Sequence, residues 1–229
     1  QCLDNITMTW DSDRECNEAA RWITPFARQP HHLTDISPFI SLLKPGGNKT
    51  IKFQESGWPN SLLTMKIRLY HNADDSPTPK EIIPIWGGTV LFNPEYDDNR
   101  PPTPFEIPSY AEKVEFVSYL TGHGWGNGTC YNCCEFCNSK HIFSVNGGVH
   151  EFEQSYPEAS QTTHCMSLEM IGEGTIPNQY GTWGYGRAGW CPGLDVDLNV
   201  TDITEYVLAG EENIIDYNAC RVSGTSCVT

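Results

Sequence analysis

The chain has 229 residues and a mass of 25.7 kDa, which is enough for one large domain or two small ones. Its formal net charge of −15 is spread along the sequence, so we expect no binding to nucleic acid or to anionic membranes. No apolar run approaches the roughly 20 residues of a membrane-spanning helix, so we expect no membrane partner.

Short elements follow one another along the chain, and most have the period of a β-strand. One helix is predicted near the start, with Asp35 as its N-cap, Pro38 in its first turn and three apolar residues on one face: Phe39, Leu42 and Leu43. Apolar and polar residues alternate at 51–54, 65–69 and 113–116, which is typical of half-buried strands. Many short strands, little helix and 36 glycines and prolines (20 and 16) indicate an all-β fold of the sandwich or jelly-roll type.

A short repeat predicts how this fold is divided. The segment 33–40, Leu-Thr-Asp-Ile-Ser-Pro-Phe-Ile, is echoed at 200–207 by Val-Thr-Asp-Ile-Thr-Glu-Tyr-Val. A Trp and a Pro precede each copy: Trp22 with Pro25, and Trp190 with Pro192. We therefore predict two tandem jelly-roll β-sandwiches packed side by side, over residues 1–85 and 86–229.

Ten cysteines and four Asn-X-Ser/Thr sequons favour an oxidising, extracellular setting, so we expect a secreted protein with several disulfides. The candidate glycosylation sites are Asn5, Asn48, Asn127 and Asn199. Natural disulfide pairs would be Cys165–Cys191 and Cys220–Cys227. Cys130-x-x-Cys133 with Cys134-x-x-Cys137 also has zinc-like spacing, but two adjacent thiols and an enclosed carboxylate would crowd a tetrahedral ion, so we expect no metal.

The most informative motif is the glycine-rich run 122–128 followed by Cys-Cys-Glu-Phe-Cys at 133–137. It places one carboxylate, Glu135, among four cysteines that are close in sequence. A carboxylate fixed in a cleft is what acid–base catalysis needs. The alternative is a loop acid that a disulfide encloses by coincidence.

Further motifs extend this one. They are Arg-Trp-Ile-Thr-Pro at 21–25, Glu55-x-x-Trp58, Gly-Thr-Trp at 181–183 and Arg-Ala-Gly-Trp-Cys-Pro-Gly at 187–193. Together they resemble the bacterial peptide-N-glycosidase F family over about residues 1–207. The resemblance implies two jelly rolls with the active site in the cleft between them. It also implies hydrolysis of the amide bond that links the first N-acetylglucosamine of an N-glycan to asparagine, without a cofactor.

The resemblance also assigns roles to residues. It implies a Cys133–Cys137 bridge that holds Glu135, with Glu55 as a second carboxylate and Asp4 in the place of the family's primary acid. Asp4 would deprotonate the attacking water, and Glu135 would hold a proton for the departing amine or hydrogen-bond the sugar. An N-glycan or glycopeptide would be bound by Trp58, Trp125, Arg187 and Trp190.

The chain departs from the family pattern at positions that matter for catalysis, so a second, non-catalytic function is also considered. Asp4 is flanked by Leu3 and Asn5 where the family has Trp and Arg, and Asn5 begins a sequon. The first strands of the first roll and the last strands of the second would also be missing, so a companion chain or neighbouring subunit would cover the open edges. The alternative is therefore a non-catalytic extracellular structural or glycan-binding module on the same fold.

A third possibility is a copper monooxygenase, because His31-His32 resembles the adjacent histidine ligands of those paired jelly rolls. Copper needs further donors, and the remaining histidines stand singly in the sequence. The pair is better interpreted as two surface histidines.

Overall fold

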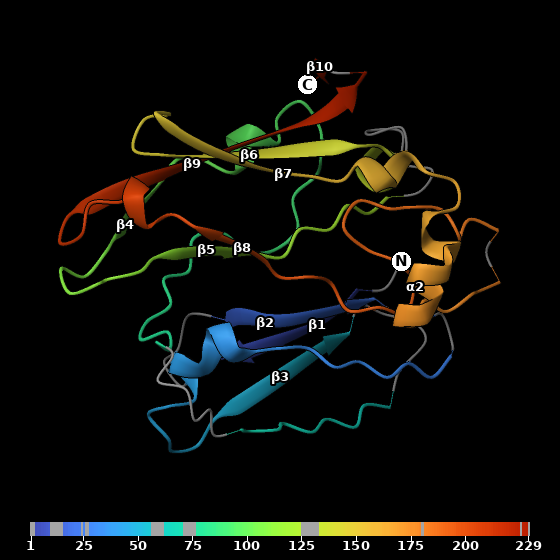
Figure 1. Ribbon diagram of the computed structural model, residues 1–229, viewed down its shortest axis with the longest axis horizontal. Coiled ribbons are helices and arrows are strands. Elements are labelled where there is room, and N and C mark those ends of the chain that lie inside the picture. Colours follow the sequence, from blue (N-terminus) through green and yellow to red (C-terminus); the bar gives the residue numbers. More distant parts are fainter. Residues whose placement is uncertain are drawn as a thin grey trace.

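The computed structural model describes residues 3–9, 16–23, 25, 28–55, 62–70, 77–124, 133–179, 181–224 and 226–228. The side chains of residues 3–9, 16–17, 50, 52, 54–55, 133 and 228 lie outside this description. Strands dominate the described chain and stack in three layers (Figure 1). None of the described helices is long and apolar enough to cross a membrane.

The first layer is an antiparallel sheet with the strand order β2-β1-β3, at the bottom of Figure 1. Its strands are β1 (Leu3–Thr9), β2 (Cys16–Ile23) and β3 (Thr50–Glu55). The 3-10 helix η1 (Ser37–Leu42) packs on it, because Phe39 and Leu42 of the helix form a buried cluster with Ala19 and Ala20 of β2.

The other two layers form a sandwich in the second half of the chain. The larger sheet has the order β10-β9-β6-β7, with β4 also paired to β9. Its strands are β4 (Thr103–Glu106), β6 (Ser139–Val145), β7 (His150–Ser155), β9 (Glu212–Ser223) and β10 (Ser226–Val228). The two-stranded sheet of β5 (Glu115–Ser118) and β8 (Asn199–Asp202) lies beneath it. Phe116 of β5 packs on Phe143 and Phe152 of the larger sheet, with ring centroids 4.7 and 5.3 Å apart.

The connections contain the remaining short helices. These are η2 (Asp97–Asn99), α1 (Cys133–Phe136), η3 (Pro157–Ser160), η4 (His164–Met166), α2 (Leu168–Glu173) and η5 (Thr204–Tyr206).

The two halves of the chain are joined by backbone pairing. The Ile23 N–H donates to the Leu194 carbonyl at 2.9 Å, and the Val196 N–H donates to the Arg21 carbonyl at 2.8 Å. The segment 194–196 therefore continues the first sheet beyond β2. We call the region where this segment meets β2 the seam. Its buried centre is the cluster of Ile23, Trp190 and Val196.

Most of the predicted elements are present. The all-β class with little helix is confirmed, and the strand predicted at 51–54 is β3. The helix predicted from Asp35 is the 3-10 helix η1, but its N-cap is Ile36 and not Asp35. The Asp35 carboxylate, one residue before this N-cap, accepts a hydrogen bond from the Ser37 N–H at 2.8 Å. The strand predicted at 113–116 begins two residues later, because the Val114 N–H donates to the Thr204 hydroxyl instead of to a strand.

The strand predicted at 65–69 is wrong. Residues 62–70 carry no strand assignment and are all exposed. Met65, Ile67 and Leu69 alternate as a half-buried strand would, but no described strand of the chain pairs with them. Alternation predicts a strand only where a partner strand supplies the hydrogen bonds.

The repeat has a structural counterpart. Asp202 accepts a hydrogen bond from the Thr204 N–H at 3.0 Å, as Asp35 does from Ser37. Ile36 and Ile203 then have nearly the same backbone angles (φ −105 and −116, ψ 16 and 15), and a 3-10 helix follows each. The two segments form the same turn. The division of the chain at residues 85 and 86 stays a prediction.

Candidate active site

A buried ion pair lies at the centre of the candidate site. Glu135, in α1, has no exposed surface, and its Oε1 accepts a hydrogen bond from Nε of Arg187 at 2.9 Å. Its Oε2 accepts from the backbone N–H of Gly124 at 3.3 Å. Both carboxylate oxygens are therefore acceptors. The two roles predicted for Glu135, holding a proton for the departing amine or hydrogen-bonding the sugar, stay predictions.

Arg187 makes several hydrogen bonds and ring contacts within the chain. Its terminal nitrogens donate to three backbone carbonyls at 2.8 to 3.2 Å, those of Thr182, Trp183 and Tyr185. The guanidinium also lies over the rings of Phe136 and Trp190, at 5.1 and 4.7 Å. Burial lowers the pKa of Arg187, and the hydrogen bond to Glu135 opposes that shift. A guanidinium with this many internal partners is suited to fixing Glu135 in place.

Trp190 connects the ion pair to the seam. Its ring is almost fully buried, and its indole N–H donates to the Gly122 carbonyl at 2.7 Å. It packs with Ile23 of β2, whose strand partner in β1 is Leu3. One continuous series of contacts therefore runs from the start of β1 to Arg187 and Glu135.

Asp4 and Glu55 are brought together by strand register. Asp4 is the Cα partner of Glu55 in the pairing of β1 with β3, and of Trp22 in the pairing of β1 with β2. Their side chains lie outside the described part of the structure, as do Trp58 and Trp125. The roles predicted for these residues stay predictions.

Two glycines keep the backbone close-packed around the pair. A Cβ on Gly122 would lie 1.6 Å from the carbonyl oxygen of Cys134, and a Cβ on Gly189 would lie 2.3 Å from that of Leu120. Gly189 also has φ +78, which L side chains rarely adopt. These contacts explain why glycine occurs at these places in the two motifs.

The structure contains the Cys165–Cys191 and Cys220–Cys227 disulfides expected from the sequence. Cys134 and Cys137 are also disulfide-bonded, which removes two of the four thiols that a zinc site would use. The side chain of Cys133 lies outside the described residues, so the Cys133–Cys137 pairing stays a prediction.

Among the described residues, no group of three or more His, Cys, Asp and Glu could hold a metal ion. His32 stacks on Trp22 with ring centroids 5.6 Å apart, and His31 is exposed. Burial is the main cause that lowers the pKa of His32, and Asp195 opposes it. The structure thus shows His32 packed against an aromatic ring and His31 at the surface.

The four sequons differ in environment. Asn48 is exposed in the loop before β3, where an attached glycan would have room. Asn199 begins β8, and its Nδ2 donates to the Tyr156 hydroxyl at 3.4 Å. The side chains of Asn5 and Asn127 lie outside the described residues.

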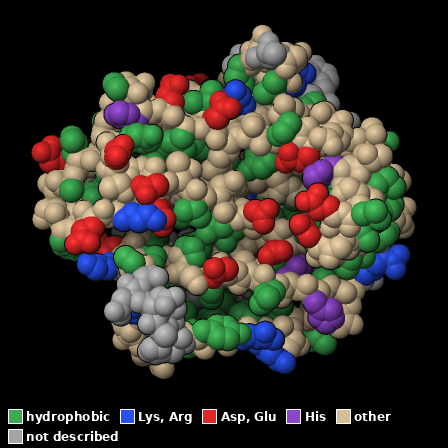
Figure 2. Space-filling model, viewed as in Figure 1, with side chains coloured by type: hydrophobic (Ala, Val, Ile, Leu, Met, Phe, Trp, Pro, Cys, Tyr) green, Lys and Arg blue, Asp and Glu red, His purple; other side chains and the backbone are tan. Residues whose placement is uncertain are grey.

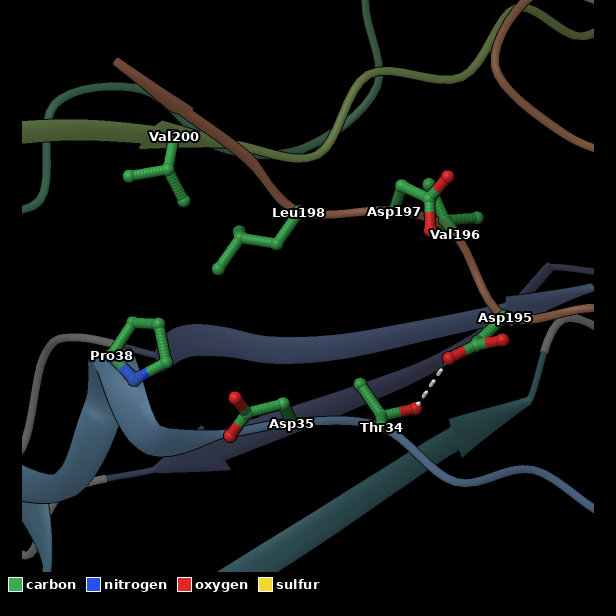
Figure 3. A pocket seen from close by; sticks show the side chains of 8 residues that line it. All are labelled: Thr34, Asp35, Pro38, Asp195, Val196, Asp197, Leu198 and Val200. Carbon is green, nitrogen blue, oxygen red and sulfur yellow. Dashed lines mark hydrogen bonds between the residues drawn. The ribbon is translucent and has the colours of Figure 1, made fainter. Parts of the chain in front are cut away.

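An acidic cleft of about 280 Å³ lies along the seam (Figure 3). Asp35, Asp195 and Asp197 line it, and the Thr34 hydroxyl donates to Asp195 at 3.1 Å. Acidic side chains are spread over the middle of the face in Figure 2. None of the site residues predicted from the sequence lines this cleft, so it is not the centre of the candidate site.

Sequence analysis missed one residue of the site, His123. Its ring stacks on Trp190, with ring centroids 4.9 Å apart and an interplanar angle of 21°. The signal was available in the motif, because His123 stands between Gly122 and Gly124. Only the tertiary structure shows that this histidine stacks on Trp190.

The family described as "Peptide-N-glycosidase F, C terminal" matches residues 92–225. The chain belongs to this family. It is also 24% identical over 235 residues to peptide-N(4)-(N-acetyl-beta-D-glucosaminyl)asparagine amidase F of Elizabethkingia miricola. That match covers 93% of this chain but only 60% of the relative's length.

Solved structures of peptide-N-glycosidase F show the same fold. One is a crystal structure of peptide-N(4)-(N-acetyl-beta-D-glucosaminyl) asparagine amidase, with a TM-score of 0.59 and 17% identity. Another is PNGase F, a glycosylasparaginase from Flavobacterium meningosepticum, with a TM-score of 0.57 and 18% identity. Each match covers 98% of this chain and 72% of the solved chain. At such identity, the likeness supports the β-sandwich fold alone.

Proposed function

We propose that this chain forms the active part of a peptide-N-glycosidase F-like amidase, which cleaves the amide bond between N-acetylglucosamine and asparagine in N-glycoproteins. The observation that carries the proposal is the strand register that sets Asp4 opposite Glu55. Both residues belong to the sheet whose strand β2 packs at the seam against Trp190. Directly opposed positions of an antiparallel pair are neighbours in the sheet, so the register supports a site that uses both carboxylates.

The chemistry would divide among these carboxylates. An amide is a poor electrophile, so the water must lose a proton as its oxygen bonds to the asparagine carbonyl carbon, and Asp4 takes that proton. The carbon–nitrogen bond then breaks, the sugar leaves as a glycosylamine that takes up a proton, and aspartate remains. Glu55 would bind the sugar, and the buried Glu135, fixed by Arg187, would position the loop of the site through its hydrogen bond with Gly124.

Other parts of the proposal concern the surroundings of the protein. The disulfides Cys165–Cys191 and Cys220–Cys227, together with the disulfide-bonded Cys134 and Cys137, support a secreted protein. An N-glycan or glycopeptide would be the ligand, with Trp58 and Trp125 as stacking faces. Trp190 is buried between Arg187 and His123 and would hold these two side chains in place. The exposed segment 62–70 supports a companion chain or neighbouring subunit as a further partner.

The test is to incubate the protein with a denatured high-mannose glycoprotein in ¹⁸O-labelled water. We expect glycosylated asparagine to become aspartate with one ¹⁸O atom, as read by mass spectrometry. Asp4→Asn should reduce the rate by about 10²- to 10⁴-fold, the usual contribution of a general base. Asp98→Asn is the matched control, because Asp98 is an exposed carboxylate of η2.

An inert wild-type protein would reject the amidase. In that case, binding of the released glycan would favour the non-catalytic glycan-binding module. Equal rates for the Asp4→Asn and wild-type proteins would remove Asp4 from the mechanism while leaving the reaction itself in place.

A further inference from the structure

His123 is a partly buried residue, but both nitrogens of its ring are buried. Neither Nδ1 nor Nε2 has a partner in the described structure, and both atoms are closed off from solvent. A buried polar atom without a partner destabilises the folded state, because it has lost its hydrogen bonds to water. Natural proteins keep few such groups, and each one requires an explanation.

The chain satisfies another buried histidine in full. His141 Nδ1 lies 2.6 Å from the Tyr217 hydroxyl, and its Nε2 lies 3.2 Å from the Ser139 hydroxyl. That histidine has only internal partners, in the larger sheet of the sandwich. The two ring nitrogens of His123, which stacks on Trp190 at the seam, have no such partners in the described structure.

The backbone on both sides of His123 is anchored. Arg21 of β2 donates to the Thr121 hydroxyl at 2.7 Å, and the Gly122 N–H donates to the Ala188 carbonyl at 2.9 Å. The Gly124 N–H is bonded to Glu135. His123 is thus fixed one residue from the atom that contacts the Glu135 carboxylate, and its ring position is set by the stack on Trp190.

The surroundings keep this imidazole neutral. Burial lowers the pKa of His123 to about 3, and the positive charges of Arg21 and Arg187 add to the shift. At neutral pH the ring has one N–H donor and one acceptor nitrogen. Such a ring favours an uncharged partner that can both donate and accept, and an amide group does both.

We propose that His123 is a substrate-binding residue whose imidazole hydrogen-bonds the acetamido group of the N-acetylglucosamine next to the Trp190 stack. This inference depends on the proposed function, because it names a contact in the same site. A half-turn of the ring about its Cβ–Cγ bond exchanges its carbon and nitrogen edges within the same stack. Such a turn would place a nitrogen where a ring carbon now lies, without moving the backbone.

The direct test measures disaccharide binding and thermal unfolding on the same variants. The probe is the β-1,4-linked disaccharide of N-acetylglucosamine, titrated by calorimetry, with cellobiose as the analogue that lacks acetamido groups. We expect His123→Phe to weaken disaccharide binding by about 5- to 10-fold, the loss of one hydrogen bond. His123→Asn, which restores a donor and an acceptor, should recover part of it.

The control is His141→Phe, which removes a histidine that has internal partners. We expect it to lower the Tm while the disaccharide affinity stays the same. His123→Phe should leave the Tm unchanged or raise it, because the protein loses an unsatisfied group. On a glycopeptide substrate, His123→Phe should raise KM more than it lowers kcat.

Two results would overturn the inference alone: wild-type affinity in His123→Phe, or a Tm loss in that variant as large as in His141→Phe. A wild-type protein that neither binds the disaccharide nor cleaves the glycopeptide would overturn the proposed function as well. A wild-type protein that cleaves, with His123→Phe equally active at every substrate concentration, would reject only the role of His123.

Discussion

At the scale of single residues, the ion pair of Arg187 and Glu135 stabilises the fold only when both charges are present. Only 3% and 0% of the two side chains are exposed, so either charge alone would be buried without its counterion. The exposed pair of Lys140 and Glu153 has a similar separation of 2.8 Å, but its side chains are 33% and 53% exposed. Water solvates those two charges whether or not they meet.

We expect Arg187→Met to lower the free energy of unfolding by about 3–5 kcal/mol, because it leaves Glu135 as a buried, uncompensated charge. Glu153→Gln is the matched change on the exposed pair and should cost less than about 1 kcal/mol. Urea unfolding followed by circular dichroism measures both. A loss for Arg187→Met as small as that for Glu153→Gln would show that the buried pair is not required for the fold.

At the scale of elements, what distinguishes β3 from the segment 62–70 is a partner. Both have alternating apolar residues, but β3 pairs with β1 through six residue pairs, and Ile51 and Phe53 pack against the first core cluster. In 62–70, Leu69 is 74% exposed and Tyr70 is 81% exposed. An alternating pattern gives a strand only when a neighbouring edge satisfies its backbone groups.

We expect Leu69→Ser to change the free energy of unfolding by no more than about 0.5 kcal/mol, because an exposed side chain loses little on truncation. Ile215→Ala in β9 is the contrasting change, since Ile215 is 1% exposed, and it should cost about 2–5 kcal/mol. Denaturant unfolding distinguishes the two. If Leu69→Ser destabilised the chain as much as Ile215→Ala, the segment would be part of a core in solution.

At the scale of the whole molecule, stability should depend on pH through two buried histidines. Burial lowers the pKa of His123 to about 3 and that of His141 to about 4, from an ordinary value of 6.5. At pH values between the folded pKa and 6.5, each of these histidines binds a proton in the unfolded chain but not in the folded chain. Stability from this source is therefore complete above pH 6.5 and decreases as the pH falls toward the folded values.

We expect each of these histidines to reduce the free energy of unfolding by about 2 kcal/mol between pH 8 and pH 5. His123→Gln should remove the contribution of His123 to this pH dependence. The free energy of unfolding, measured by urea unfolding at several pH values, should then change less with pH. An unchanged slope in that variant would mean that His123 titrates in the folded protein as it does in the unfolded chain.

The sequence by itself determined the local features. Alternation predicted β3, Asp35 and Pro38 predicted the helix that the structure shows as η1, and cysteine usage predicted the Cys165–Cys191 and Cys220–Cys227 disulfides. These features depend on neighbours in sequence or on the strong tendency of cysteines to pair in an oxidising setting. The motifs around Glu135 and Arg187 also indicated the family before any geometry was known.

Only the tertiary structure decided which of these residues meet. It brought Arg187 to Glu135 across 52 positions, left both nitrogens of His123 without a described partner, and left the alternating segment 62–70 without a described partner strand. Contacts between distant segments depend on how whole layers pack, and neither period nor composition contains that information. The chemistry predicted for Asp4 and Glu55 likewise depends on a register between two strands that lie far apart in the sequence.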